Sequence, residues 1–180
     1  WDRQTNLPAA PVPGQFGVLR YMNQSARLVG VDVSGHVPLA RNAFGAWRVK
    51  GVLNATRGRN TDTGSGLYRV MPLNTKLALQ HAWGNFEHTL EVVGVRAKTN
   101  VSAPREELRT PGYGLVNWRG SATSGSLRVD LGIENLFDRH YELPLGGTYV
   151  GQGTTMSIGG VPFGIAVPGM GRSVNVGVNY

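Results

Sequence analysis

Several things are scarce in this sequence of 180 residues. It contains no cysteine, which excludes a disulfide framework and a Cys-ligated metal site. Only 16% of the residues are charged, whereas soluble domains usually carry about 25%. Apolar runs such as 28–33 fall far short of the roughly 18 to 20 residues that a transmembrane helix needs. Any membrane span of this chain must therefore be a strand in a closed barrel.

The charges that are present are mostly basic, with 18 Lys and Arg against 11 Asp and Glu and a net charge of +7. Such a balance raises nucleic acid as a partner. The basic residues are scattered singly, however, and no RNA-binding or helix-turn-helix pattern accompanies them. We therefore expect no nucleic-acid partner and interpret these charges as groups on the lumen side and in the loops of a barrel.

Apolar and polar residues alternate along most of the chain, and a period of two predicts strands. The alternation is clearest at 127–134, where Leu127 and Val129 take turns with Arg128 and Asp130. Eight strands are predicted in this way, at 17–23, 26–37, 46–57, 73–83, 88–98, 113–122, 127–134 and 172–180. The stretch from Trp83 to Phe86 is short enough to be a hairpin turn.

The strand predicted at 88–98 has no clear phase. Leu90 and Val92 favour one register, whereas Val93 and Val95 favour the other. Its two faces are therefore left unassigned.

The connections between the strands alternate between short and long, and 26 glycines help to form them. Phe44, Trp47, Trp83 and Phe86 lie beside the short turns, while Tyr68, Tyr113 and Phe137 lie toward the long loops. Short periplasmic turns, longer extracellular loops and two girdles of aromatic residues are typical of outer-membrane barrels. The sequence therefore predicts an all-β fold, a transmembrane antiparallel β-barrel, with a soluble β-sandwich as an alternative that would keep its loops more even in length.

One segment resembles a known family. The residues from Gly132 through Asn135, Leu136, Phe137 and Asp138 to Tyr141 are similar to the motif G-x-x-N-L-F-D-x-x-Y near the end of TonB-dependent receptor barrels. Further segments match in the right order: Tyr21 and Asn23, then Ala26, Gly30 and Asp32, then 110–113 at the start of a strand. Asp32 stands where the family more often has Glu.

The resemblance covers residues 1–180 and implies the C-terminal portion of a receptor barrel, about the last eight strands of a barrel of about 22. The plug domain and the earlier strands would then lie outside this chain. Tyr180 does not fit the usual terminal assembly signal directly, so we expect the natural protein to continue by about two residues and to end in an aromatic residue.

The resemblance also implies a function. The whole protein would be a transporter in the bacterial outer membrane that takes up a scarce ligand, with a ferric siderophore or another iron complex expected first. Its partners would be outer-membrane lipid, the TonB complex through the plug domain, and a small-molecule ligand such as a metal chelate. Neither a cofactor nor enzymatic chemistry is expected. The alternative is a self-contained small outer-membrane barrel with a structural or adhesive role.

No catalytic arrangement is found in the sequence. On the predicted lumen side, we expect contacts with the plug or the ligand from Arg48, Lys50, Arg128, Asp130 and Glu134. The long loops at 58–66, 99–110 and 142–171 are expected to contribute to ligand capture. A metal site at Asp138, His140 and Glu142 is not expected, because no second cluster supplies further ligands.

Overall fold

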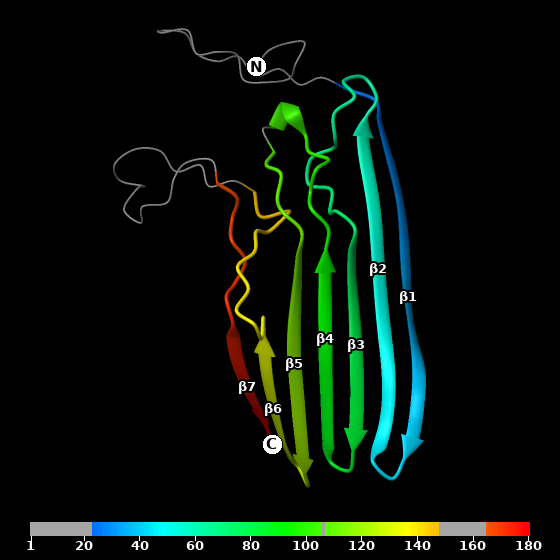
Figure 1. Cartoon of the computed structure of the whole chain (residues 1–180), viewed down its shortest axis with the longest axis vertical. Coiled ribbons are helices and arrows are strands. Elements are labelled where there is room, and N and C mark those ends of the chain that lie inside the picture. Colours follow the sequence, from blue (N-terminus) through cyan, green and yellow to red (C-terminus); the bar gives the residue numbers. More distant parts are fainter. Residues whose placement is uncertain (1–22, 106, 148–164) are drawn as a thin grey trace, which may run out of the picture.

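The computed structural model describes residues 23–105, 107–147 and 165–180, which form a single antiparallel sheet (Figure 1). The sheet has seven strands in the order β1-β2-β3-β4-β5-β6-β7, so each strand pairs with its neighbours along the chain. The strands are β1 (Ala26–Asn42), β2 (Gly45–Asn60), β3 (Asn74–Trp83), β4 (Phe86–Val95), β5 (Tyr113–Ser124), β6 (Leu127–Glu134) and β7 (Ser173–Asn179). A short 3-10 helix, η1 (Ala103–Arg105), lies between β4 and β5.

Seven of the predicted strands are confirmed, with corrections at their ends. β1 continues to Asn42, because its pairing with β2 resumes after a bulge between Pro38 and Ala40. β4 stops at Val95 and not at residue 98, since the N–H of Lys98 turns to the carbonyl of Thr110 in an isolated bridge. The strand predicted at 17–23 lies almost wholly outside the described residues.

Three tight turns lie at the same end of the sheet. They join β1 to β2, β3 to β4 and β5 to β6, and the longer connections lie at the opposite end (Figure 1). Gly84 and Gly125 occupy these turns with φ of 55° and 61°, a backbone conformation that glycine adopts without steric cost. The predicted alternation of short and long connections and the hairpin at 83–86 are confirmed.

The register of the sheet separates two faces, because residues directly opposite each other in an antiparallel pair share a face. The apolar face carries Val31, Val33, Val49, Leu53, Leu77, Leu79, Leu90, Val92, Val116, Trp118, Val129, Leu131, Val174 and Val176. The polar face carries Asp32, Arg48, Lys50, Asn54, Lys76, Gln80, Glu87, Glu91, Asn117, Arg119, Arg128, Asp130, Glu134 and Asn175.

The register also settles the phase of β4. Leu90 pairs with Leu79 and Trp118 on the apolar face. Val93 lies on the polar face, opposite Lys76 and Leu115. Apolar residues thus interrupt the polar face in the middle of the sheet, which is why alternation alone gave no answer for this strand.

Among the residues that the structure describes, no second layer covers the apolar face of the sheet. Among the described residues only Val95 and Ala166 are buried hydrophobic side chains, whereas Val31, Leu77 and Val176 are 59%, 54% and 67% exposed. No helix in the described part of the chain is long and apolar enough to cross a membrane. An apolar face of this size needs a cover, since soluble monomers rarely expose large contiguous apolar patches.

Candidate functional site: the polar face and its loop-side clasp

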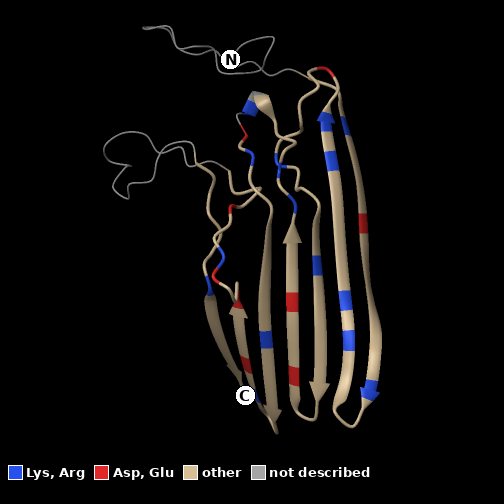
Figure 2. Cartoon of the chain, in the orientation of Figure 1, with Lys and Arg blue, Asp and Glu red and all other residues tan. Residues whose placement is uncertain are grey.

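The polar face holds all five residues that the sequence predicts for the lumen side. Arg48 and Lys50 lie on β2, whereas Arg128, Asp130 and Glu134 lie on β6. Three strands separate the two sets, so they do not form one site. Figure 2 shows the division of charge, with basic residues along β2 and acidic residues along β4.

On the β4–β6 half of this face the charges compensate one another. Arg119 on β5 lies 2.9 Å from the carboxylate of Glu134 and 3.8 Å from that of Glu91. Asn117 donates to Glu91 over 2.9 Å, and its Oδ1 accepts from the backbone N–H of Asn135 at 2.9 Å. This network crosses three strands and connects the wall of the sheet to the start of the loop after β6.

A second set of charges is compensated nearer the turn end. Arg128 lies 3.0 Å from Asp130 on the same strand and 4.0 Å from Glu87 on β4. Asn179 on β7 donates to Asp130 at 3.4 Å. The sequence does not predict that Glu87, Glu91, Asn117 and Arg119 share this face, because alternation gives no phase for β4.

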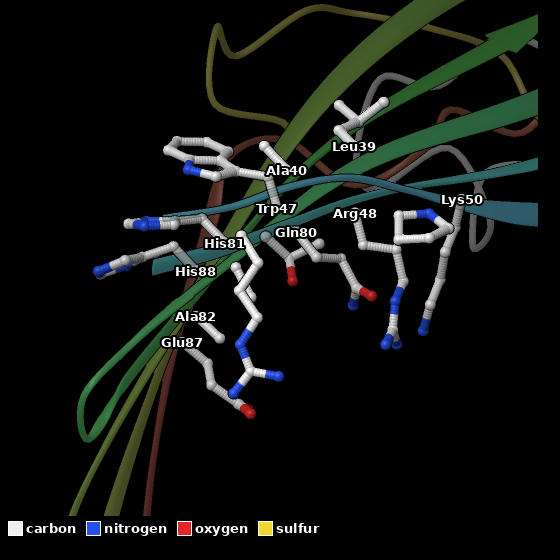
Figure 3. Close-up of a pocket in the computed structure, with 14 residues that line it drawn as sticks. Leu39, Ala40, Trp47, Arg48, Lys50, Gln80, His81, Ala82, Glu87 and His88 are labelled. Atoms are coloured by element: carbon white, nitrogen blue, oxygen red, sulfur yellow. The ribbon is translucent and has the colours of Figure 1, made fainter. Parts of the chain in front are cut away.

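The β1–β3 half of the polar face is different. No described carboxylate lies within salt-bridge distance of Arg41, Arg48 or Lys50. These residues line a hollow of about 700 Å³ at the turn end of β1 to β4, together with Gln80 and Glu87. Figure 3 shows Arg48, Lys50, Gln80 and Glu87 projecting from one side of the sheet and Trp47, His81 and His88 from the other.

On that other side, four aromatic rings form a row across β2 to β5. Trp47 stacks on His81 with ring centroids 3.9 Å apart, His81 is followed by His88 at 6.2 Å, and His88 by Trp118 at 6.0 Å. Trp118 reaches His88 across Gly120, where a Cβ atom would lie 2.8 Å from the indole ring. The pairing of His81 with His88 could have been predicted from the sequence, because the two residues are equidistant from the turn at 84 and 85.

The family motif forms the loop-side clasp, a set of contacts that closes the long connection after β6. Asn135 is 3% exposed and has a φ of 50° in the left-handed region, where Asn is favoured over most residues. Its side-chain amide donates to the carbonyls of Arg139 at 2.8 Å and Met170 at 3.2 Å, and its Oδ1 accepts from the N–H of Arg139. The N–H of Leu136 donates to the carbonyl of Val116 at 2.8 Å.

The rest of the motif completes the clasp. Asp138, with a φ of 52°, accepts from the backbone N–H of Arg172 at 2.7 Å. The ring of Tyr141 lies against the ring of Tyr113, with centroids 4.5 Å apart. The backbone carbonyl of Tyr141 accepts a hydrogen bond from the N–H of Gly169 at 2.8 Å. Phe137 is the exception, because its side chain is 74% exposed. These residues hold the outgoing and returning ends of the loop together, so the motif has a structural role.

No group of three or more His, Cys, Asp or Glu that could hold a metal is present among the described residues. Asp138, His140 and Glu142 follow the end of β6 and do not share the face of a strand. The carboxylate of Asp138 is instead used by the clasp.

The connection between β4 and β5 contains a buried ion pair. The ammonium group of Lys98 lies 2.7 Å from the carboxylate of Glu107, and the two side chains are 1% and 8% exposed. Glu107 also accepts from the backbone N–H groups of Arg69 and Ser102, each at 2.9 Å. This carboxylate therefore joins the β4–β5 connection to the β2–β3 connection beside it.

Comparison with known proteins finds the same fold in solved structures. No protein-family model and no curated protein matches the sequence. The structure described as "Copper transporter OprC" matches with a TM-score of 0.77 at 20% identity over 88% of this chain. The ferric yersiniabactin uptake receptor FyuA from Yersinia pestis matches with a TM-score of 0.61 at 19% identity over 85% of this chain. Both are TonB-dependent receptors.

The chain has the fold of a TonB-dependent receptor barrel wall. The expected resemblance is thereby confirmed at the level of the fold. The receptor fold is represented only in part, because the chain spans 24% and 23% of the length of the two receptors. The first neighbour is described as a transporter and the second as an uptake receptor.

Proposed function

We propose that this chain forms the C-terminal portion of the barrel wall of a TonB-dependent outer-membrane transporter. The observation that carries the proposal is the division of one continuous sheet into an exposed apolar face and a hydrogen-bonded polar face. In a bilayer the first would contact lipid and the second would face the lumen. The strands of 7 to 17 residues and the match to two receptors of this class support the same assignment.

The aromatic residues at the turn end fit this placement. Trp83 and Phe86 are 56% and 47% exposed and stack on each other with centroids 6.5 Å apart. Phe44, in the preceding turn, is 75% exposed. Aromatic rings of this kind favour the membrane–water interface, so the tight turns would lie at the periplasmic surface.

In the whole transporter, residues 1–180 would be joined by a plug domain and by earlier strands of the barrel. The plug would contact the polar face and the TonB complex, while the connections at the loop end would contribute to ligand capture. The ligand we propose is a ferric siderophore or another iron complex. A ferric yersiniabactin receptor among the structural neighbours supports iron, and the copper transporter keeps another metal as the competing ligand.

The test is uptake of labelled iron complexes and of labelled copper by whole cells. A strain that lacks the complete gene is compared with the same strain carrying it, with and without a functional TonB protein. We expect uptake of at least one iron complex to require both the gene and TonB. Unchanged uptake of every iron complex would remove the iron hypothesis, and TonB-independent uptake would favour a self-contained barrel.

A further inference from the structure

Two arginines lie on the apolar face of the sheet near its loop end. Arg57 is on β2, directly opposite Val29. Arg96 directly follows β4 and donates its backbone N–H to the carbonyl of Leu73 at 2.9 Å, which continues the register of the apolar face. Both side chains are exposed, and no described carboxylate lies within salt-bridge distance of either. A cation in the middle of a lipid-facing surface is costly, so its depth and its partner matter.

The depth of these arginines in a membrane follows from the aromatic residues at the turn end. Arg57 lies ten residues after Trp47 on the same face of β2, and Arg96 lies ten residues after Phe86. At about 3.3 Å per residue and a tilt of about 40°, ten residues rise about 25 Å, which is the height of the apolar band of an outer-membrane barrel. With the aromatic residues at the periplasmic surface, both guanidinium groups reach the headgroups of the outer leaflet.

Both arginines line one groove of about 500 Å³. The groove follows from the length of the strands, because β3 begins at Asn74 and pairs with β2 only as far as Asn54. The last residues of β2 therefore have no partner on β3. Among the apolar side chains in the lining are Val29, Val31, Ala55, Val70, Met71 and Leu73. The groove thus combines an apolar surface with two cations, which matches the chemistry of an anionic amphiphile.

The strands around this groove belong to the described chain. β2 and β4 are inner strands of the sheet, so each already has both of its neighbours. In the proposed transporter the plug would lie on the opposite face, and the earlier strands would join the sheet beyond β1. Lys98, the other basic residue in the lining, is already paired with Glu107. The membrane is therefore the nearest source of an anion for the two arginines.

We propose that the groove between Arg57 and Arg96 binds a phosphorylated lipid of the outer leaflet, with the phosphate held by the two guanidinium groups and an acyl chain against the apolar lining. Arginine suits this role because its planar fork binds phosphate oxygens in a bidentate way. Arg27 and Arg59 pair with each other beside this site, and Figure 2 shows basic residues gathered at the loop end of β1 and β2. The inference rests on the proposed placement of the apolar face in lipid and adds a specific site to it.

The test uses the full-length receptor in detergent, with lipid binding measured by titration in native mass spectrometry. The probes are lipid A with two phosphate groups, the same lipid after both phosphates have been removed, and inorganic phosphate. We expect the phosphorylated lipid to bind and the dephosphorylated lipid to bind at least about tenfold more weakly, because charge-assisted hydrogen bonds are lost. Equal binding of the two lipids overturns the proposal. Displacement of the lipid by an equal concentration of inorganic phosphate overturns it as well, since the site would then take a free anion.

The double variant Arg57→Gln/Arg96→Gln is expected to lose at least about tenfold in affinity for the phosphorylated lipid. Arg57→Lys/Arg96→Lys keeps both charges but not the bidentate fork, so we expect an intermediate affinity. If the first variant does not fold, the second decides, and an affinity equal to that of the wild type overturns the proposal.

A matched control removes two other arginines from the same end of the sheet. Arg69 and Arg139 are exposed and do not line the groove. The double variant Arg69→Gln/Arg139→Gln should bind the phosphorylated lipid as the wild type does. An equal loss of affinity in the control and in the groove variant would mean that only the overall charge attracts the lipid, and the proposal would be wrong.

Uptake measured on the same strains separates this inference from the function on which it rests. TonB-dependent uptake of a labelled metal complex, together with no preference for the phosphorylated lipid, overturns the inference alone. Retained lipid binding in a receptor without any TonB-dependent uptake overturns the proposed transport and leaves the lipid site standing.

Discussion

At the scale of single residues, Asn135 links the two ends of the clasp through its side-chain amide. It is buried, adopts a left-handed backbone conformation and makes three side-chain hydrogen bonds within the clasp. Replacing it with alanine leaves the carbonyls of Arg139 and Met170 without these donors. The residue therefore determines how the chain leaves β6, and its identity is dictated by geometry.

We predict that Asn135→Ala lowers the free energy of unfolding of the full receptor by about 3 kcal/mol, from lost hydrogen bonds and from the cost of alanine at a positive φ. Urea unfolding of the receptor in lipid vesicles, followed by tryptophan fluorescence, measures the change. Asn85→Ala is the matched control, because Asn85 is exposed in a turn and its recorded hydrogen bond uses only its backbone carbonyl. Equal effects of the two substitutions would contradict the role given to Asn135.

The buried pair Lys98–Glu107 leads to a prediction about which of the two residues contributes more to stability. Glu107→Leu leaves the ammonium group of Lys98 and two backbone N–H groups without their partner. Lys98→Met leaves a carboxylate that still accepts from both N–H groups. We expect a loss of about 3 to 5 kcal/mol for the first variant and a smaller loss for the second, since an unpaired buried charge is strongly destabilising.

Hydrogen exchange at the amides of Ser102 and Thr110 reports this local stability. Faster exchange should appear in Glu107→Leu first and in Lys98→Met to a smaller extent. A larger effect of Lys98→Met would show that the ammonium group, and not the carboxylate, holds the two connections together.

At the scale of secondary structure, neighbouring residues of one strand face different surroundings. Leu77 lies on the apolar face and is 54% exposed, while Ala78 lies on the polar face between Lys50 and Glu91. We predict that Leu77→Lys destabilises the receptor in a bilayer by about 2 to 4 kcal/mol, as a lysine on the lipid face does, and that Ala78→Lys is tolerated.

The two variants are compared by unfolding in lipid vesicles and by their amounts in purified outer membranes. The control is internal, since both substitutions add the same side chain to the middle of β3. Tolerance of Leu77→Lys with loss of Ala78→Lys would mean that the two faces have been assigned the wrong way round.

Most of the strands and turns could be predicted from the sequence. Alternation located seven strands, and the glycines at 84 and 125 marked their turns. The phase of β4 was not predictable, because Val93 and Leu115 place apolar side chains on the polar face, where period two no longer distinguishes the sides. The network around Glu91 depended on that phase, and the clasp depends on contacts between residues more than thirty positions apart, such as Asn135 with Met170.

At the scale of the whole molecule, the described sheet is a wall without a core. Its valine-rich face is exposed, and within the described residues β1 pairs only with β2 and β7 only with β6. Unpaired strand edges and large apolar patches both promote association. A closed barrel in a membrane would cover the apolar face with lipid and would pair both strand edges with other strands.

We therefore predict that residues 1–180, expressed alone, do not dissolve in buffer without detergent. The fraction that remains in the supernatant after high-speed centrifugation, with and without detergent, measures this. The full-length receptor, refolded in the same detergent, is the control. A monomeric chain in plain buffer would favour the soluble β-sandwich over any membrane barrel.

The connection between β6 and β7 has a consequence for how the sheet forms. The other hairpins are closed by short turns or by connections of moderate length, whereas this one runs from residue 135 to residue 172. Closing a longer loop costs more conformational entropy, and contacts distant in sequence form more slowly. The clasp brings both ends of this connection beside β6, with Asn135 bound to Met170 and Asp138 to Arg172. We expect β7 to join the sheet last. The contacts of the motif would form first and would bring β7 beside β6.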